Sequence, residues 1–200
     1  MRNINIKELA TAVFDIEAKS INQLKGRLDR QFEAAVDCLD CCKGRIVVCG
    51  MGKSGLVGKK IAATFSSIGQ PAMFLHPSEA IHGDLGMLMS GDCFLSISNS
   101  GETDELLQLI PHVERLELQH ICMVGNINST LAKHSNYVLN VGVEEEASSL
   151  QAVPMASTIV AMAMGDALAA VLIQLRSFQS EDFARLHPGG SLGRKLITSV

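Results

Sequence analysis

VVCGMGKSG, residues 47–55, is the stretch that decides the fold, because it joins an apolar run to a glycine-rich turn. Its glycines, Gly50, Gly52 and Gly55, satisfy the G-x-G-x-x-G fingerprint of dinucleotide-binding folds. Gly52-Lys53-Ser54 also imitates the end of a Walker A loop, but the first glycine of that motif is replaced by Val47. The long loop that wraps a nucleotide's phosphates is therefore not expected here.

The dinucleotide interpretation also lacks its second half. That fingerprint requires an acidic residue after the second strand to bind the ribose, whereas residues 72–75 are followed by His76 and Pro77. What remains is a strand, a tight turn and a helix beginning near Ser54, whose free N–H groups can hold one phosphate. Ser54 would add a hydroxyl and Lys53 a positive charge. Taken alone, the stretch fits a plain strand-to-helix turn equally well.

The spacing of apolar runs predicts an α/β protein. Short buried runs separated by helical segments predict a parallel, doubly wound sheet, here a flavodoxin-like three-layer α/β/α sandwich. Residues 6–42 are expected to be helical, with two helices joined near Lys19 and a capping box at Ser20 and Gln23. We expect one domain over 1–200, with helices to about 43 and the sheet core and C-terminal helices over 44–200. The five predicted strands are 46–49, 72–75, 93–97, 121–124 and 137–141.

Composition narrows the class of protein. Hydrophobic residues make up 47% of the chain, aromatic residues only 4%, and the net charge is −4, which disfavours a nucleic-acid-binding protein. The N-terminus lacks an apolar signal core, so we expect a cytoplasmic protein with reduced thiols. Residues 154–178 predict an apolar core helix, partly covered by partner subunits, in preference to a membrane span. Cys38, Cys41 and Cys42 would share one helix face as small core residues.

A second loop favours the phosphate interpretation. SISNSGETDE, residues 96–105, places Ser98, Ser100 and Thr103 around Gly101 at another expected helix start. With strand order 2-1-3-4-5, the first and third strands flank the point where the sheet topology reverses. Both loops would then face one crevice that suits a phosphate monoester and leaves no obvious place for an adenine nucleoside.

Three further segments carry candidate chemistry. HPSEAIHGDLGM, residues 76–87, could bind a metal, form a capped surface helix or place His82 for proton transfer, but its spacing matches no standard metal cage. VGVEEEASSL, residues 141–150, leaves the carboxyl end of the fifth strand, where a carboxylate can be a general base. In ARLHPGGSLGRKL, residues 184–196, His187 can equally be a helix C-terminal cap.

Three motifs taken in order, residues 47–87, 98–105 and 186–196, resemble the sugar isomerase (SIS) domain, and more closely its D-arabinose 5-phosphate isomerases of bacterial Kdo synthesis. The resemblance covers nearly all of 40–196. It implies a five-stranded parallel sheet, homotetramers with active sites shared between subunits, and reversible conversion of D-ribulose 5-phosphate to D-arabinose 5-phosphate without an obligatory metal or cofactor. It implies phosphate binding by Ser54, Ser98, Ser100 and Thr103, a substrate loop with Gly50, Gly52 and Gly101, and catalysis by Lys53, His82, Glu105, Glu146 and His187.

The chain departs from the pattern near Glu146, where family members commonly have a Cys-Pro pair and a threonine and this chain has Ser148-Ser149 and Met155. Many members also carry two CBS modules after the SIS domain, near where this chain ends at Val200. We expect Glu146 to be the base, Lys53 or His82 to stabilise charge on oxygen, and Glu105 to orient Lys53. We expect His187, which a neighbouring subunit could contribute, to open the furanose form or shuttle protons.

Two alternatives remain open from the sequence. One is a non-catalytic sugar-phosphate sensor on the same fold, although the 45 residues before the first strand look too short and insufficiently basic for a DNA-binding module. The other is an isomerase of a different phosphosugar.

Overall fold

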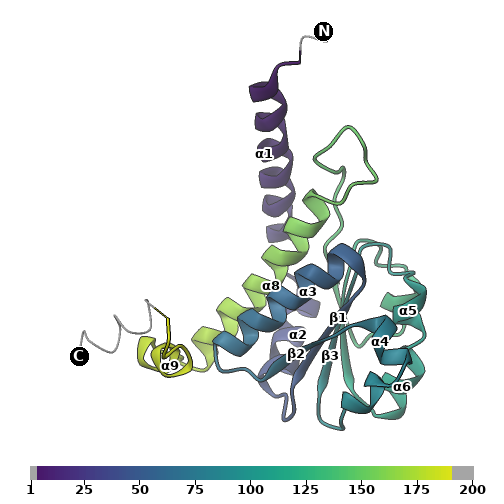
Figure 1. The fold of residues 1–200 in the computed structure, drawn as a ribbon, viewed down its shortest axis with the longest axis vertical. Helices are drawn as coiled ribbons and strands as arrows, with labels where there is room; N and C mark the ends of the chain where they lie inside the picture. Colours follow the sequence, from purple (N-terminus) through teal and green to yellow (C-terminus); the bar gives the residue numbers. More distant parts are fainter. Residues whose placement is uncertain (1–3, 191–200) are drawn as a thin grey trace.

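The computed structural model describes residues 4–190, which build a five-stranded parallel sheet in the order β2-β1-β3-β4-β5 (Figure 1). Ile46 of β1 pairs with Ala72 on one side and with Cys93 on the other, so the three strands begin in register. The predicted strands and their order are confirmed. Their bounds are β1 Ile46–Gly50, β2 Ala72–Leu75, β3 Cys93–Ser98, β4 Gln119–Val124 and β5 Tyr137–Asn140.

Helices cover both faces of the sheet, as the predicted three-layer sandwich requires (Figure 1). One core lies between the sheet and α2, α3 and α8, and a second core lies on the opposite face beneath α4 to α7. The helices on the first side are α1 Ile6–Gln23, η1 Leu24–Arg27, α2 Arg30–Asp40, α3 Gly52–Ser67, α8 Ala156–Leu175 and α9 Ser180–Leu186. The remaining helices are α4 Pro77–Ile81, η2 Asp84–Met87, α5 Asp104–Leu107, α6 Ile110–Arg115 and α7 Thr130–Lys133.

The N-terminal helical region divides at a different place from the one predicted. Ser20 lies inside α1, where its hydroxyl donates to the carbonyl of Ile16 at 2.8 Å and caps no new helix. The break follows Gln23, and α2 starts after Asp29, whose carboxylate accepts the backbone N–H of Gln31 at 2.9 Å. The predicted capping box at Ser20 was wrong because Asp29, a stronger N-cap with two free N–H groups to bind, starts the second helix.

The cysteine prediction was wrong in part. Because α2 ends at Asp40, Cys41 and Cys42 follow its last turn and do not continue one helix face with Cys38. Cys41 is exposed, whereas Cys38 and Cys42 are half-buried against the first core.

The long apolar helix α8 packs along α3, as predicted, and by length and composition it is the described helix apolar enough to cross a membrane. Half of it is buried inside the chain. A Cβ on Gly165 would lie only 2.5 Å from Cδ1 of Ile61, so the glycine is what lets α8 approach α3 closely. This contact places the first turn of α8 near the first turn of α3, which is where the candidate site lies.

Candidate functional site

The opening glycines serve the backbone geometry of the turn between β1 and α3. Gly52 has a φ of +57°, in the left-handed region that favours glycine. A Cβ on Gly55 would lie 2.5 Å from the carbonyl oxygen of Gly50, so Gly55 lets the first turn of α3 approach the end of β1. The G-x-G-x-x-G spacing is therefore explained by chain packing, and it delivers Lys53 and Ser54 to the first turn of the helix.

The second loop gathers three hydroxyl groups at the end of β3. The Ser98 Oγ lies 2.8 Å from the Thr103 Oγ1 and 3.4 Å from the Ser100 Oγ, and it accepts the backbone N–H of Gly101 at 3.0 Å. Gly101 has a φ of +68°, and a Cβ there would lie 2.0 Å from the Ser129 hydroxyl. Only glycine fits this turn, so Gly101 holds the hydroxyl groups together.

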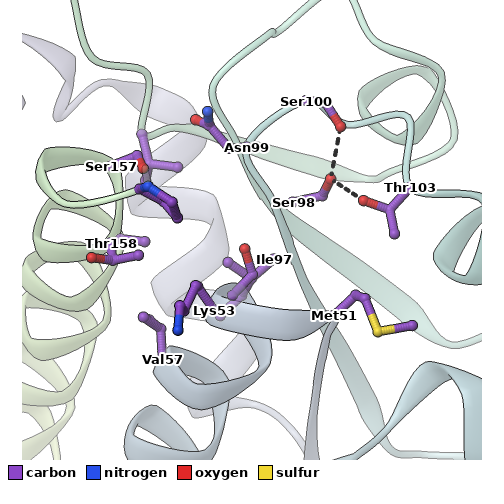
Figure 2. Close-up of a pocket in the computed structure, with 14 residues that line it drawn as sticks. Met51, Lys53, Val57, Ile97, Ser98, Asn99, Ser100, Thr103, Ser157 and Thr158 are labelled. Atoms are coloured by element: carbon purple, nitrogen blue, oxygen red, sulfur yellow. Dashed lines mark hydrogen bonds between the residues drawn. The ribbon is translucent and has the colours of Figure 1, made fainter. Parts of the chain in front are cut away.

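Both loops open into one cavity of about 360 Å³ (Figure 2). Figure 2 shows Ser98, Ser100 and Thr103 on one side, Lys53 at the start of α3, and Thr158 of α8 on the other side. The sequence-predicted phosphate residues are thus brought together, and the size of the cavity is at the lower end for small-molecule sites. The lining residues are Met51, Lys53, Ser54, Val57, Ile97, Ser98, Asn99, Ser100, Thr103, Val141, Pro154, Ser157, Thr158 and Ala161.

Lys53 supplies the positive charge of this cavity. Its side chain makes no ion pair within residues 4–190, so its ammonium is available to an anion. Glu105 is half-buried in α5 and does not contact Lys53, so the expected pairing between these two residues was wrong. The phosphate loop comes between them, because β3 ends in that loop and α5 begins after it.

Glu146 lies beside the cavity wall and is only 8% exposed. Its Oε2 accepts the backbone N–H groups of Met155 at 2.7 Å and of Ser157 at 3.3 Å, at the start of α8. The free N–H groups at a helix start favour an anion there, and no described residue donates a hydrogen bond to Oε1. One carboxylate oxygen is therefore fixed by the helix while the other remains available, although Glu146 does not itself line the cavity.

The loop that carries Glu146 is tied to the N-terminal helices. The Arg27 guanidinium donates to the carbonyl of Gly142 at 2.5 Å. Glu144 accepts from Lys19 at 2.7 Å and from Gln23 at 2.8 Å. The first of these partners holds the pKa of the Glu144 carboxyl below its usual value. These contacts set where the chain after β5 turns back toward α8.

His82 is not part of the cavity. It is the exposed residue that ends α4, followed by Gly83 at a φ of +135°. Within residues 4–190, no group of three or more His, Cys, Asp or Glu side chains is arranged to hold a metal ion. The placement matches the surface-helix alternative for this segment within a single chain.

His187 lies at the C-terminal end of α9, far from the cavity. Its ring stacks on Phe183 with centroids 3.8 Å apart, and its Nδ1 is 2.9 Å from the Phe183 carbonyl oxygen. Glu146 caps the start of α8, whereas α9 follows the end of that helix (Figure 1). A 20-residue helix is about 30 Å long. Residues 191–196 of the same motif lie outside the described residues.

Sequence reasoning missed Asn99, Ser157 and Thr158 in the cavity wall. Asn99 stands between two predicted serines, and its position in a loop at a strand end was a usable signal. Ser157 and Thr158 follow Pro154 at the start of a long helix, where hydroxyl groups are common, but only the tertiary fold shows that this helix start faces the other two loops. The Thr158 hydroxyl donates to the Met155 carbonyl at 2.7 Å.

Comparison with known proteins gives consistent matches. The SIS domain family model matches residues 39–171. A protein of Haemophilus influenzae named "Probable arabinose 5-phosphate isomerase" is 47% identical over all of this chain and 59% of its own length. The arabinose 5-phosphate isomerase of Yersinia pestis is 46% identical over 98% of this chain and 60% of its own length. The present chain thus spans about 60% of the length of these curated relatives.

A solved structure adds a match over the whole of its own chain. A protein of E. coli CFT073, described as being in complex with a sugar phosphate, superposes with a TM-score of 0.89 at 35% identity and covers 94% of this chain and 100% of its own. The region matched by the family model includes the cavity loops and Glu146 and ends before His187.

Proposed function

The chain belongs to the SIS domain family, and we propose that it is an aldose–ketose isomerase that interconverts D-ribulose 5-phosphate and D-arabinose 5-phosphate. The observation that carries this proposal is the cavity itself, where three clustered hydroxyl groups face a lysine that pairs with no described acid, beside a buried carboxylate. The names of relatives at 46–47% identity support the choice of substrate.

In this proposal the phosphate is held by the hydroxyl loop. Ser98, Ser100 and Thr103 now hydrogen-bond to one another and to nearby N–H groups, so they are already gathered at one point. Their hydroxyls can turn toward a phosphate, to which hydrogen bonds are stronger because they are charge-assisted. Ser54, across the cavity, adds a hydroxyl at the first turn of α3. Holding the phosphate places the C1–C2 end of a five-carbon sugar toward α8.

Isomerisation moves a proton between C1 and C2 through an enediol, which requires a base at carbon and a donor at oxygen. We assign the base to the free Oε1 of Glu146, because Oε2 is fixed by α8. Lys53 stabilises the negative charge that develops on the sugar oxygen. Asn99 and Thr158 add neutral donors in the same cavity.

The proposal includes a homotetramer with shared sites. Within one chain, His187 and Glu146 lie at opposite ends of α8, so His187 can serve a cavity only by coming from another chain. The apolar side chains of α1 that face away from α8 provide a surface for such a partner, including Ile6 at 78% and Phe14 at 68% exposed. His82, exposed on α4, would need the same explanation to act. We further propose that the chain works in the cytoplasm and supplies Kdo biosynthesis, as the family resemblance implies.

The test is to incubate the purified chain with D-ribulose 5-phosphate and identify the product by sugar analysis. Ribulose 1-phosphate, fructose 6-phosphate and sedoheptulose 7-phosphate serve as alternative substrates. Arabinose 5-phosphate formed fastest from ribulose 5-phosphate supports the proposal. Tight binding by calorimetry without turnover would replace it with a sugar-phosphate sensor, and faster turnover of another phosphosugar would replace the substrate.

A further inference from the structure

A second cavity, of about 540 Å³, lies at the amino ends of the strands. It is lined by the first residues of three strands, Cys93 of β3, Gln119 of β4 and Tyr137 of β5, and by Cys38 of α2. Because the strands are parallel, this edge of the sheet is opposite the one that carries Ser98 and the candidate active site. The second cavity is therefore a separate place on the molecule.

Two thiols meet in this cavity. The Sγ atoms of Cys38 and Cys93 are 3.7 Å apart, although the two residues are 55 positions apart in the sequence. Cys93 is 1% exposed, whereas Cys38 is half-buried, and both border the cavity. The cavity therefore gives a small reagent a way to Cys38, with Cys93 directly behind it.

The other cysteines do not form such a pair. Cys42 directs its Sγ to the carbonyl oxygens of Arg45 and Gly91, each at 3.6 Å. Cys49 and Cys122 are buried in the core on the opposite face of the sheet. Cys41 is exposed to solvent.

The two paired thiols differ in character. A hydrogen bond from the Cys93 S–H holds the pKa of the Cys38 thiol below its ordinary value. The same hydrogen bond, together with burial, raises the pKa of Cys93 well above its ordinary value. Since the thiolate is the reactive form, the accessible sulfur is the nucleophile and the buried sulfur carries the proton.

We propose that Cys38 and Cys93 are a peroxide-sensitive thiol pair, in which a small hydroperoxide oxidises Cys38 and Cys93 then closes an intrachain disulfide. In the first step the Cys38 thiolate attacks one peroxide oxygen, the O–O bond breaks, and the leaving hydroxide takes a proton to become water. Cys38 is oxidised to a sulfenic acid.

In the second step the Cys93 sulfur attacks the Cys38 sulfur, the S–O bond breaks, and the Cys93 proton leaves with the hydroxyl group as a second water. Two thiols and one hydrogen peroxide thus give one disulfide and two waters. The sulfur separation has to shorten from 3.7 Å to about 2.05 Å, a small movement for a residue at the start of a strand and one in a helix. The product joins α2 covalently to β3.

The experiment uses the full chain carrying Cys41→Ser and Cys42→Ser, which removes two of the six cysteines and leaves Cys38, Cys49, Cys93 and Cys122. The protein is treated with hydrogen peroxide, denatured, and its remaining free thiols are alkylated and counted by mass spectrometry. We expect the loss of two thiols per chain, their recovery with dithiothreitol, and a peptide map in which the Cys38 and Cys93 peptides are joined. Cys49 and Cys122 are the internal references, because burial raises their thiol pKa values to about 12 and about 11.

Two variants in this background separate the roles of the pair. Cys93→Ala should stop the reaction at a Cys38 sulfenic acid that dimedone traps, whereas Cys38→Ala should leave Cys93 unreacted. The unsubstituted pair needs no variant to fold, so the peptide map alone decides the disulfide. Retention of all four thiols, oxidation of Cys93 in the absence of Cys38, or a covalent dimer on a non-reducing gel would overturn the proposal.

Discussion

Glu146 and Ser157 are joined by a hydrogen bond that links the acidic loop to the wall of the cavity. The carboxylate Oε2 of Glu146 accepts the Ser157 backbone N–H at 3.3 Å, and Ser157 itself borders the cavity. The carboxylate is thereby held at the start of α8 with its other oxygen free. A group that both caps a helix and borders a site is positioned by the fold itself, and this position underlies the assignment of Glu146 as the base.

The hydroxyl loop should determine phosphate affinity. We expect Ser100→Ala combined with Thr103→Val to weaken binding of D-arabinose 5-phosphate by about 10- to 100-fold per lost charge-assisted hydrogen bond, which corresponds to roughly 1.5–3 kcal/mol each. Ser98 is a poorer choice, because it also accepts the Gly101 N–H and its loss would disturb the turn. Calorimetric titration measures the affinity.

The matched control for that experiment is Ser66→Ala, which removes an exposed hydroxyl near the far end of α3, bonded to the Ala72 carbonyl. This variant should bind as the wild type does. If the double variant also kept its affinity, the phosphate would have to bind elsewhere.

His120 should make the fold sensitive to acid. Burial lowers the pKa of this histidine to about 4, while its Nε2 lies 2.7 Å from the Ser96 hydroxyl. Glu114 and the His134 carbonyl raise the pKa and the His134 side chain lowers it, but burial outweighs them. An unfolded histidine titrates near 6.5, so between about pH 6.5 and pH 4 the unfolded chain binds more protons and folding stability falls as the pH falls.

The loss should approach about 3 kcal/mol by pH 4, at 1.36 kcal/mol per pKa unit. Urea unfolding from pH 7 to pH 4 measures it, with His120→Gln expected to lose this part of the pH dependence. His112→Gln on α6 is the control and should keep it. Equal pH profiles for His120→Gln and the wild type would show that His120 does not carry the effect.

Most of the sheet could be predicted from the sequence, because each parallel strand is a short apolar run between turn residues. The same local signals located both cavity loops: Gly52 and Gly101 mark turns with positive φ, and Ser98, Ser100 and Thr103 follow a buried strand. Convergence of the loops then followed from the strand order. The roles assigned to these residues stay predictions.

The failures share a physical cause, which is competition between residues distant in space or in sequence. Ser20 has the residue type of a helix cap, but Asp29 starts the second helix and α1 continues through Ser20. The contact of Glu146 with the start of α8 depends on how residues 147–154 fold back, and no local pattern reports it. The Cys38–Cys93 contact likewise arises only when α2 packs on the sheet.

The exposed apolar side chains of α1 should hold the chain in an oligomer. Light scattering at micromolar concentration should give a mass well above the 21.4 kDa of one chain, with a tetramer as the expected state. Phe14→Glu places a charge on a side chain that is 68% exposed in the single chain and should lower the mass. Its neighbour Asp15→Asn is the control and should not. A wild-type monomer would contradict the shared-site account.

Mixing two inactive variants tests whether His187 serves a neighbouring chain. Glu146→Gln and His187→Ala should each be nearly inactive alone. If the site combines Glu146 of one chain with His187 of another, oligomers reassembled from both variants should regain part of the activity, since some sites then contain both intact residues. Absence of any recovery after verified exchange of subunits would place both residues in one chain's site or remove His187 from the chemistry.

The most direct measurement is the turnover of D-ribulose 5-phosphate by Glu146→Gln beside its matched control Glu145→Gln. Glutamine keeps an oxygen that can accept the Met155 and Ser157 N–H groups, so the start of α8 should stay capped while the base is lost. We predict that kcat falls by about 100-fold or more with a smaller change in KM, because a positioned base contributes about that factor to the transition state. Glu145, which is exposed, should be replaceable without effect. Wild-type kcat in Glu146→Gln would contradict the account and leave Glu146 as a helix cap alone.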